Sequence, residues 1–418
     1  MFEIFNPGEQ LVPIKVWLPS PEHLDEVCMR QAYNLSNLPF AFRHIALMPD
    51  THAGYGMPIG GVLAVQDVVV PNAVGVDIGC GICFIHTDVP AYILRDVSAP
   101  KISLAEYIVK RIMQQVPQGF EHHKTPQKSS MIDSLIKQQA PDNPTRLYSY
   151  GHQKLPQLEE AYYQIGTLGG GNHFIELQED EDGLLGIMVH TGSRNFGYKV
   201  ANYFNNLAKS MNKKMKSLVP REYDLAYLPA DTVEAQGYIG WMNLASDFAR
   251  SNRTLIMERV QNIVFNAIRQ FTGIKRISIT MEVNAHHNYA AFEEHFGRKL
   301  WIHRKGAIRA KKGELGIIPG AMGGYSYIVE GLGNPESFNS SSHGAGRIMG
   351  RREAVRQFSL DEVMEDFQEK DIVLGKRRKR DTAEEYYKAY KDIDEVMHQQ
   401  LDLVKPVLKL KTIAVVKG

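Results

Sequence analysis

The stretch VGVDIGCGICF (residues 74–84) places three glycines around an aspartate, Asp77, and a cysteine, Cys80. A buried strand has little use for so much glycine, because glycine contributes no side chain to the core. Bare backbone would instead let the chain fold tightly around a bound group, with a carboxylate and a thiol beside it. The stretch therefore predicts a ligand site in a glycine-rich turn.

Strands and helices are mixed on both sides of this stretch. Helices are predicted at 21–38, 103–116, 198–217, 231–271, 342–358, 360–369 and 382–404. Strands are predicted within 45–71, 166–177, 186–197 and 276–290 and at LWIHRKGAI, YSYIVEGLG and TIAVVKG, and 118–160 is predicted to be loops with one short helix. Because no regular βαβ order appears, we expect an α+β layered core. No linker divides the chain, so residues 1–418 are interpreted as one catalytic domain.

Composition and charge narrow the class of protein. The chain has 418 residues and a formal net charge of +1, and this overall charge indicates no particular partner. Basic residues cluster at 209–216 and 376–380, and these clusters would bind RNA only if they flank a site. Three cysteines argue against a disulfide framework and for a cytoplasmic protein, and Cys28 and Cys83 are interpreted as small hydrophobic residues. The start MFEIFNPGEQ shows no signal peptide, and no apolar run approaches the roughly 18 residues of a membrane span.

Five potential metal ligands lie in similar surroundings. Asp77, Cys80, His173, His190 and His287 each occupy a strand end or a turn beside glycine or another small residue. Such positions often carry functional side chains, and thiolate, imidazole and carboxylate together suit zinc, manganese, iron or cobalt. A cysteine thiolate can also bridge two ions. These residues therefore indicate a two-metal centre with Cys80 between the ions.

Two alternatives stay open on the residues alone. His286 is as suitable a ligand as its neighbour His287. His44 and the Asp-Thr-His segment at 50–52 form a further polar cluster at a strand end, which suits a capped turn as well as a functional role.

The segment NSSSHGAGRIMGRREAVRQF (339–358) combines a histidine, glycines and an arginine. Its serines predict a helix N-cap, and its glycines leave the first turn bare, so that backbone amides and the helix dipole would favour a phosphate. Arg347 adds a planar fork for phosphate oxygens, and a neutral His343 can attack phosphorus. The alternative is a helix start packed through small residues. Glycine turns within 166–177 and 318–327 are further candidate phosphate cradles.

Several motifs together resemble one family. They are MPDTHAGYGMPIGG, VGVDIGCGI, LGGGNHFIEL, HTGSRNFG, HHNY, IPGAMGGYSYIVEGLGN, SHGAGR, AYKDIDEVM and the terminal VVKG, in family order from about residue 44 onwards. They resemble the RtcB-type RNA ligases. The resemblance implies an enzyme that joins RNA ends with a 2′,3′-cyclic phosphate or 3′-phosphate to 5′-hydroxyl ends, using GTP and manganese. It also implies the RtcB-like fold, with mixed, mainly antiparallel sheets flanked by helices.

The resemblance implies a role for individual residues. His343 would be the guanylylated histidine. The ligands of two manganese ions would be Asp77, Cys80, His173, His190 and His287, with Cys80 bridging the ions. The resemblance also favours His287 over His286 as the ligand. The GTP contacts would be Asn172, Phe174, Glu176, Ser326, Tyr390 and Lys417, with Asn288 beside a metal ligand. Arg194 and Arg347 would hold RNA or phosphate groups.

Two positions depart from the family pattern. Ala321 replaces a serine of the glycine turn, which removes one hydroxyl contact to the nucleotide and would cost on the order of 1 kcal/mol. Asn195 replaces a glycine, and asparagine tolerates a left-handed backbone, so the turn would survive. The physiological RNA is left open. We expect a monomeric protein that does not associate with a membrane. Whether it needs an activating protein partner is left open.

Two other functions compete with ligation. A two-metal phosphodiesterase that only opens cyclic phosphates would need the metal ligands but neither His343 nor Lys417. An RNA-binding module with a structural metal would show metal-dependent folding and no turnover.

Overall fold

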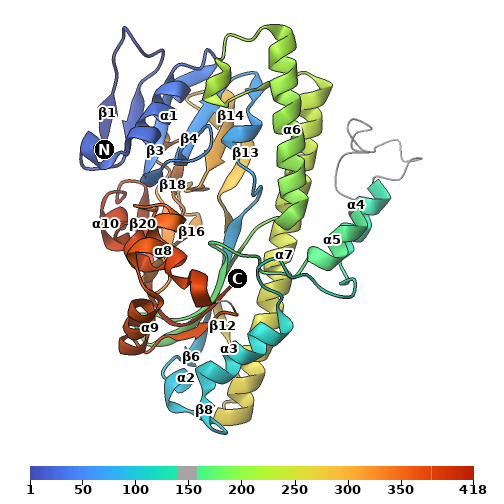
Figure 1. The fold of residues 1–418 in the computed structure, drawn as a ribbon, viewed down its shortest axis with the longest axis vertical. Helices are drawn as coiled ribbons and strands as arrows, with labels where there is room; N and C mark the ends of the chain where they lie inside the picture. Colours follow the sequence, from blue (N-terminus) through green and yellow to red (C-terminus); the bar gives the residue numbers. More distant parts are fainter. Residues whose placement is uncertain (139–157, 378) are drawn as a thin grey trace.

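Two large β-sheets with flanking helices make up most of the architecture, and three two-stranded sheets complete the described part of the chain (Figure 1). The computed structural model describes residues 1–138, 158–377 and 379–418. Most neighbouring strands in this part of the chain run antiparallel. The expected α+β fold with mainly antiparallel sheets is therefore confirmed.

The first sheet has six strands in the order β1-β2-β3-β4-β14-β13. Their bounds are β1 (Phe2–Ile4), β2 (Ile14–Val16), β3 (Ala41–His52), β4 (Ile59–Val65), β14 (Arg298–Lys305) and β13 (Asn288–His295). β2 pairs with β3 in parallel, and the other neighbours are antiparallel. The long strand β3 carries Asp50 and His52 to its C-terminal end.

The second sheet has seven strands in the order β12-β6-β10-β9-β20-β17-β16, and an eighth, β19, pairs with β20. Their bounds are β12 (Ile279–His286), β6 (Gly81–Pro90), β10 (Leu184–Thr191), β9 (Phe174–Glu179), β20 (Val404–Lys417), β17 (Tyr325–Gly331), β16 (Leu315–Pro319) and β19 (Val373–Gly375). His287 is the single residue between β12 of this sheet and β13 of the first. One backbone unit therefore joins the two sheets.

Helices cover the sheets from several sides (Figure 1). Their bounds are α1 (Glu26–Ser36), α2 (Ile93–Asp96), α3 (Leu104–Gln115), α4 (Ser130–Gln138), α5 (Leu158–Gln164), α6 (Arg194–Met215), α7 (Val233–Thr272), α8 (Arg351–Gln357), α9 (Leu360–Glu369) and α10 (Ile393–His398). None of these described helices is long and apolar enough to cross a bilayer. Of the region predicted as loops with one short helix, residues 139–157 lie outside the described residues, and α4 and α5 flank them.

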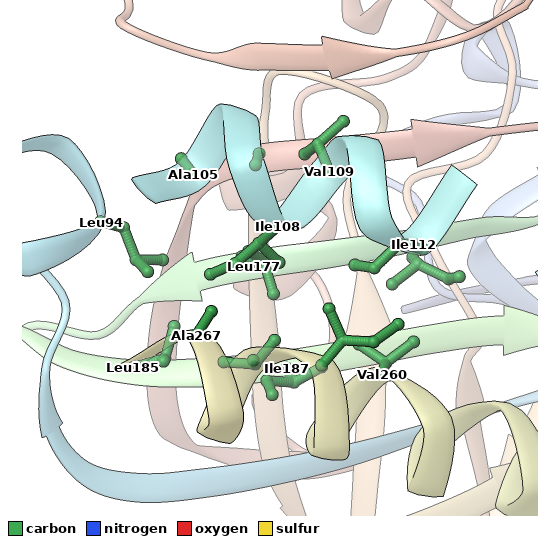
Figure 2. Close-up of a cluster of buried hydrophobic side chains, with 14 of the residues drawn as sticks. Leu94, Ala105, Ile108, Val109, Ile112, Leu177, Leu185, Ile187, Val260 and Ala267 are labelled. Carbon is green, nitrogen blue, oxygen red and sulfur yellow. The ribbon is translucent and has the colours of Figure 1, made fainter. Parts of the chain in front are cut away.

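The helices α3 and α7 pack on one face of the second sheet. Ile108 and Ile112 of α3 and Val260 of α7 share a buried cluster with Leu177 of β9 and Ile187 of β10 (Figure 2). Apolar residues at helical spacing therefore meet apolar residues at every second strand position, as amphipathic elements require. Burial of this cluster fixes which face of each strand points away from the helices.

The opposite face of that sheet carries the polar residues of interest. Ile187 lies under the helices, whereas Met188 belongs to a different apolar cluster on the other face. His190 follows two residues later and therefore shares the face of Met188. By the same alternation Glu176 of β9 and Lys417 of β20 point to this face, because the residues next to them in their strands belong to the helix-covered cluster. The period of the strands thus gathers these side chains.

The predicted helix at 342–358 is wrong in its first half. Three serines form β18 (Ser340–Ser342), which pairs with β15 (Ala307–Arg309), and the helix α8 begins only at Arg351. The serines therefore contribute ladder hydrogen bonds and do not cap a helix.

A backbone requirement explains this difference. Gly346 has a φ of +76°, and a Cβ atom there would lie 2.2 Å from the carbonyl oxygen of Asp50. The chain around His343 is therefore an irregular loop pressed against β3, where only glycine fits. The prediction that His343 lies at a helix start is wrong, because His343 follows a strand.

The predicted helix at 382–404 is also wrong. Short 3-10 segments at Lys379–Glu385 and Tyr387–Ala389 precede α10, and β20 already begins at Val404. Tyr390 interrupts any continuous helix, because its backbone is extended, with φ −124° and ψ 161°.

Candidate active site

The turn that holds Cys80 is fixed by backbone hydrogen bonds. The Cys80 amide donates to the carbonyl oxygen of Asp77 at 3.1 Å, and the Cys80 carbonyl accepts from the His287 amide at 2.9 Å. The Asn288 side chain donates to the carbonyl oxygen of Asp77 at 3.0 Å. These bonds hold the thiol and the carboxylate close to the joint between the two sheets.

The glycines of this turn serve close packing. A Cβ on Gly79 would lie 2.6 Å from the Cα atom of Ser246 in α7, and a Cβ on Gly81 would lie 2.3 Å from the Ala285 carbonyl oxygen in β12. Both distances are too short for any side chain. Gly79 and Gly81 therefore let the turn approach a helix and a strand, a different reason from the one expected from the sequence.

The structure brings the five candidate metal ligands into two groups that share Cys80. One group contains Cys80, His190 and His287, and the other contains Asp77, Cys80 and His173, with potential ligand atoms within 4.8 Å of one another in each group. The Cys80 Sγ atom lies 3.3 Å from Nε2 of His190 and 3.5 Å from Nε2 of His173. The shared thiol therefore lies between two sets of donor atoms.

The proton positions in this cluster suit cation binding. The His173 Nδ1 atom lies 2.9 Å from the Leu168 carbonyl oxygen, which can accept its proton, and Nε2 faces the other potential ligands, 3.1 Å from Oδ2 of Asp77. Burial lowers the pKa of His190 and of His287, which keeps both imidazoles neutral. The Nδ1 atom of His287 is buried without a hydrogen-bond partner among the described residues.

The thiol needs a positive charge to ionise. Burial and then the Asp77 carboxylate raise the pKa of Cys80, so the protein alone favours the protonated thiol. A metal cation would reverse this preference, because a coordinating thiol is deprotonated. Sulfur, imidazole and carboxylate donors converge on one place, and this donor set fits transition-metal ions.

His287 and not His286 belongs to this cluster. The His287 ring centroid lies 5.2 Å from that of His190. The His286 ring instead packs against Tyr289, with ring centroids 4.1 Å apart. The strand alternation at the end of β12 sends the two neighbouring rings to different sides.

Two buried polar residues of α7 hold the ligand-bearing turns, and the sequence analysis missed both. Arg253 donates to the carbonyl oxygens of Gly79 at 2.8 Å and Thr191 at 3.2 Å. The Asn252 side chain bonds the backbone of Thr167 and accepts from the Gly166 amide at 2.6 Å. A signal for them was present, because Asn252 falls on the same apolar stripe of the helix as the buried residues Ala249 and Ile256.

His343 lies beside this cluster and is paired with a buried carboxylate. Its Nδ1 atom is 2.6 Å from Oδ2 of Asp50, and its backbone amide donates to the same oxygen at 3.1 Å. The ring centroids of His343 and His287 are 4.7 Å apart. Asp50 belongs to the polar segment at 50–52 that the sequence left undecided, and the structure places it in contact with the candidate nucleophile.

A central cavity opens in front of His343. Its walls come from β3, β9, β10, β20 and the loops around residues 319–322 and 343–347. The lining includes His52, Asn172, Phe174, Glu176, His190, Ala321, His343, Arg347, Arg351, Glu385, Tyr390 and Lys417. Glu176 and Lys417 reach it because the strand alternation directs them away from the helix-covered face. Burial raises the pKa of Glu176 to about 7.

Glu385 organises the positive charges of one wall, and the sequence analysis missed it. Its carboxylate lies 3.1 Å from Arg351, 3.4 Å from Arg347 and 3.6 Å from Lys417, and it accepts a hydrogen bond from the Tyr390 hydroxyl. Burial alone would raise the pKa of Glu385, but Lys417 and Arg351 lower it to about 2. The carboxylate is therefore ionised and orients three cations.

Arg347 makes several protein contacts at this wall. Its guanidinium donates to the Tyr390 hydroxyl at 2.7 Å and to the Glu384 carbonyl oxygen at 2.8 Å, and Nε donates to the Met349 carbonyl oxygen at 3.0 Å. These contacts fix its orientation at the edge of the cavity.

Three predicted contact residues lie outside the lining of the central cavity. The Asn288 side chain braces the Cys80 turn, and Ser326 lies behind Glu176, where Gln178 donates to both Glu176 and Ser326. Arg194 donates to the Gly119 carbonyl oxygen at 3.1 Å and lines a neighbouring cavity.

Comparison with known proteins agrees with the geometry. The family model described as tRNA-splicing ligase RtcB matches residues 31–418. The chain is 38% identical to RNA-splicing ligase RtcB of Escherichia coli K12, with 97% of each chain covered. It is 33% identical to tRNA-splicing ligase RtcB of Nanoarchaeum equitans, with 100% of this chain and 98% of that one covered.

The chain belongs to the RtcB family.

Two positions of this RtcB-family chain depart from the expected motifs. Ala321 lines the central cavity and offers no hydroxyl there. The left-handed residue of the HTGSRNFG turn is Arg194, with φ +54°, and Asn195 is the second residue of α6. Asn195 therefore does not use the left-handed backbone that asparagine tolerates, because the helix begins one residue before it.

Proposed function

We propose that this RtcB-family chain is a GTP- and manganese-dependent RNA ligase. It would join RNA ends with a 2′,3′-cyclic phosphate or a 3′-phosphate to 5′-hydroxyl ends, in RNA repair or tRNA splicing. The observation that carries the proposal is the His343–Asp50 pair, in which His343 lies at the cavity wall beside the two groups of potential metal ligands that share Cys80. We also propose that residues 1–418 act as one catalytic domain, because β3, β9, β10 and β20 all contribute to the site.

The residues proposed to hold the metal ions are those of the two groups that share Cys80. Asp77 and His173 would hold one ion, His190 and His287 the other, with Cys80 bridging them. Bound ions would neutralise negative charge that develops on phosphate oxygens. Manganese is favoured by the family resemblance, and the mixed sulfur, nitrogen and oxygen donors are compatible with it.

His343 is proposed to carry the covalent step. Because Asp50 accepts the proton on Nδ1, the Nε2 atom has a free lone pair. Nε2 would attack the α-phosphorus of GTP, form an N–P bond and displace pyrophosphate as its P–O bond breaks. The Nδ1 proton stays in place, and the Asp50 carboxylate stabilises the positive ring that results.

The nucleotide would lie in the central cavity before this attack. Glu176 is proposed to accept from the guanine N–H groups and Lys417 to contact the nucleotide phosphates. Asn172, Phe174 and Tyr390 would complete the cavity walls, and the family resemblance adds Ser326 and Asn288 as GTP contacts.

RNA would then take the guanylyl group. An oxygen of the RNA 3′-phosphate attacks the phosphorus on His343, the N–P bond breaks, and His343 is released. The 5′-hydroxyl oxygen of the second RNA end attacks the activated 3′-phosphate and gives up its proton to solvent, and GMP leaves with the electrons of the broken P–O bond. Arg194 and Arg347 are proposed to hold RNA phosphates, and a cyclic phosphate must first be opened by water.

The proposal predicts a covalent label on the protein. Incubation with GTP labelled at the α-phosphate and manganese should leave one acid-labile, base-stable label, because a phosphorus–nitrogen bond to histidine has this stability pattern. The His343→Ala variant should carry none. Absence of label on the native protein would overturn ligation through His343. The phosphodiesterase would be favoured by a different result, in which the native protein takes no label and does not ligate RNA, and His343→Ala still opens all of the cyclic phosphate.

Glu176→Gln should stabilise the protein at pH 8 but not at pH 4. The pKa of Glu176 is about 7 in the folded state, whereas an unfolded chain gives about 4.3. The neutral Glu176 carboxyl therefore makes its full contribution to the free energy of unfolding below about pH 4.3, and this contribution is lost as the pH rises through about 7. Glutamine stays neutral throughout, so its advantage in the free energy of unfolding should grow to at most about 4 kcal/mol by pH 8. Urea unfolding at both pH values measures this, and an advantage that does not depend on pH would contradict the assignment.

A further inference from the structure

An outer cavity adjoins the central cavity on the side of the Asp77–His173 group. Its volume is about 730 Å³, within the range of roughly 300–1,000 Å³ that is usual for ligand pockets. Its lining includes Asp77, His173 and Arg194, and it shares Asn172, Arg351, Glu385 and Lys417 with the central cavity. A ligand in the outer cavity would therefore reach the candidate metal ligands without entering the central cavity.

Phe120 lines this outer cavity with an unpacked ring. Its relative exposure is 103%, so the ring buries no surface against the protein. The backbone around it is nevertheless held in place. The Gly119 amide donates to the Gly169 carbonyl oxygen at 2.9 Å, the Gly119 carbonyl accepts from Arg194, and the Glu121 amide donates to the Gln118 carbonyl at 3.1 Å. An anchored loop thus presents a free aromatic face beside the site.

Both positive and negative side chains line the cavity beside this loop, and the carboxylates are those of Asp77, Glu121, Asp381, Glu384 and Glu385. Arg351, Lys376 and Arg377 all line the cavity. Arg377 is paired with Glu121 at 2.6 Å, and both side chains are about half exposed, at 50% and 52%. Exposed ion pairs of this kind contribute little to stability. Arg377 can therefore exchange its partner for a phosphate group at little cost.

We propose that the outer cavity binds the single-stranded RNA next to its reacting end, with Phe120 stacking on a base and Arg377 contacting a backbone phosphate. An aromatic face combined with cations that follow the backbone is the chemistry that binds single-stranded nucleic acid without reading its sequence. A protein partner is disfavoured, because a lone ring beside cations and a polar cavity lacks the apolar core of a protein interface. The inference rests on the proposed RNA ligase function.

Phe120→Ala should raise the KM for a 3′-phosphate RNA oligonucleotide by about 5- to 150-fold, the range for losing one base–aromatic stack. Labelling of His343 by GTP should stay at the native rate, since that step needs no RNA. Phe120→Trp should keep the native KM, and RNA should quench its added fluorescence. Tyr92→Ala is the matched control, because Tyr92 is 56% exposed and lies outside both cavities.

The salt dependence separates stacking from charge. Arg377→Gln should weaken RNA binding and flatten its dependence on salt, whereas Phe120→Ala should leave that slope unchanged. The inference would be overturned by an unaltered KM for RNA in Phe120→Ala together with unquenched fluorescence in Phe120→Trp. The same two results would be expected if Phe120 contacted a protein partner and not RNA. A native protein that takes no label from GTP would instead overturn the proposed function. The two failures are therefore distinguishable in one set of preparations.

Discussion

Asp50→Asn should slow the transfer of GMP to His343 by about 10²- to 10⁴-fold, the range expected when a general base or the orienting carboxylate of a histidine is lost. Asp50 holds the His343 proton on Nδ1 and leaves Nε2 free. An asparagine that turned its amide group to Nδ1 would move the proton to Nε2 and block the attack. One that turned its carbonyl would keep the tautomer but remove the negative charge that stabilises the guanylylated ring.

The measurement is the single-turnover rate of His343 labelling at saturating GTP and manganese. Asp180→Asn is a matched control, because Asp180 is also a buried carboxylate that lies close to a histidine, 2.8 Å from His86, away from both cavities. That variant should label at the native rate. A rate for Asp50→Asn within about threefold of native would contradict the role given to this carboxylate, since a factor of three corresponds to less than 1 kcal/mol in the barrier.

Cys80→Ser should weaken the binding of both metal ions by more than about 100-fold, because changes in residues that only support a ligand already cost about 10- to 100-fold. The thiol belongs to both donor groups, so a single substitution affects two sites. A serine hydroxyl is a poorer donor, since it does not ionise as a thiol does when a cation binds. Ligation should fall in parallel.

Binding of Mn²⁺ can be counted by the loss of the free-ion electron paramagnetic resonance signal. His287→Ala should weaken one of the two sites, whereas His286→Ala should leave both intact, because its ring packs on Tyr289. Titration of Cys80→Ser with Co²⁺ should also lack the sulfur-to-metal charge-transfer band of the native protein. Two tight sites in Cys80→Ser would show that sulfur does not bridge.

The placement of the candidate metal ligands was largely predictable. Asp77, Cys80, His173, His190 and His287 all stood at a strand end or in a turn, with a glycine within two residues of each except His287, and strand alternation directs His190 to a fixed face. The choice between His286 and His287 was open from the residues, and only the family resemblance favoured the latter. Sequence could not supply the packing that separates the two rings.

The surroundings of His343 were much less predictable. A run of serines followed by glycines and arginines is compatible with a capped helix, and the local pattern cannot reveal that the serines pair with β15. Contact between Gly346 and Asp50 joins residues almost 300 positions apart in the chain. The orienting carboxylate, and likewise Glu385, could be found only once distant segments were placed side by side.

The place of β20 in its sheet has a consequence for biosynthesis. This strand follows the others of its sheet along the chain, yet it lies between β9 and β17. During translation, β9 and β17 must therefore wait as open edges until residues 404–417 have left the ribosome, and open edges invite pairing with other nascent chains. Lys417 arrives with the same strand. Prematurely terminated products would consequently be inactive as well as prone to aggregate.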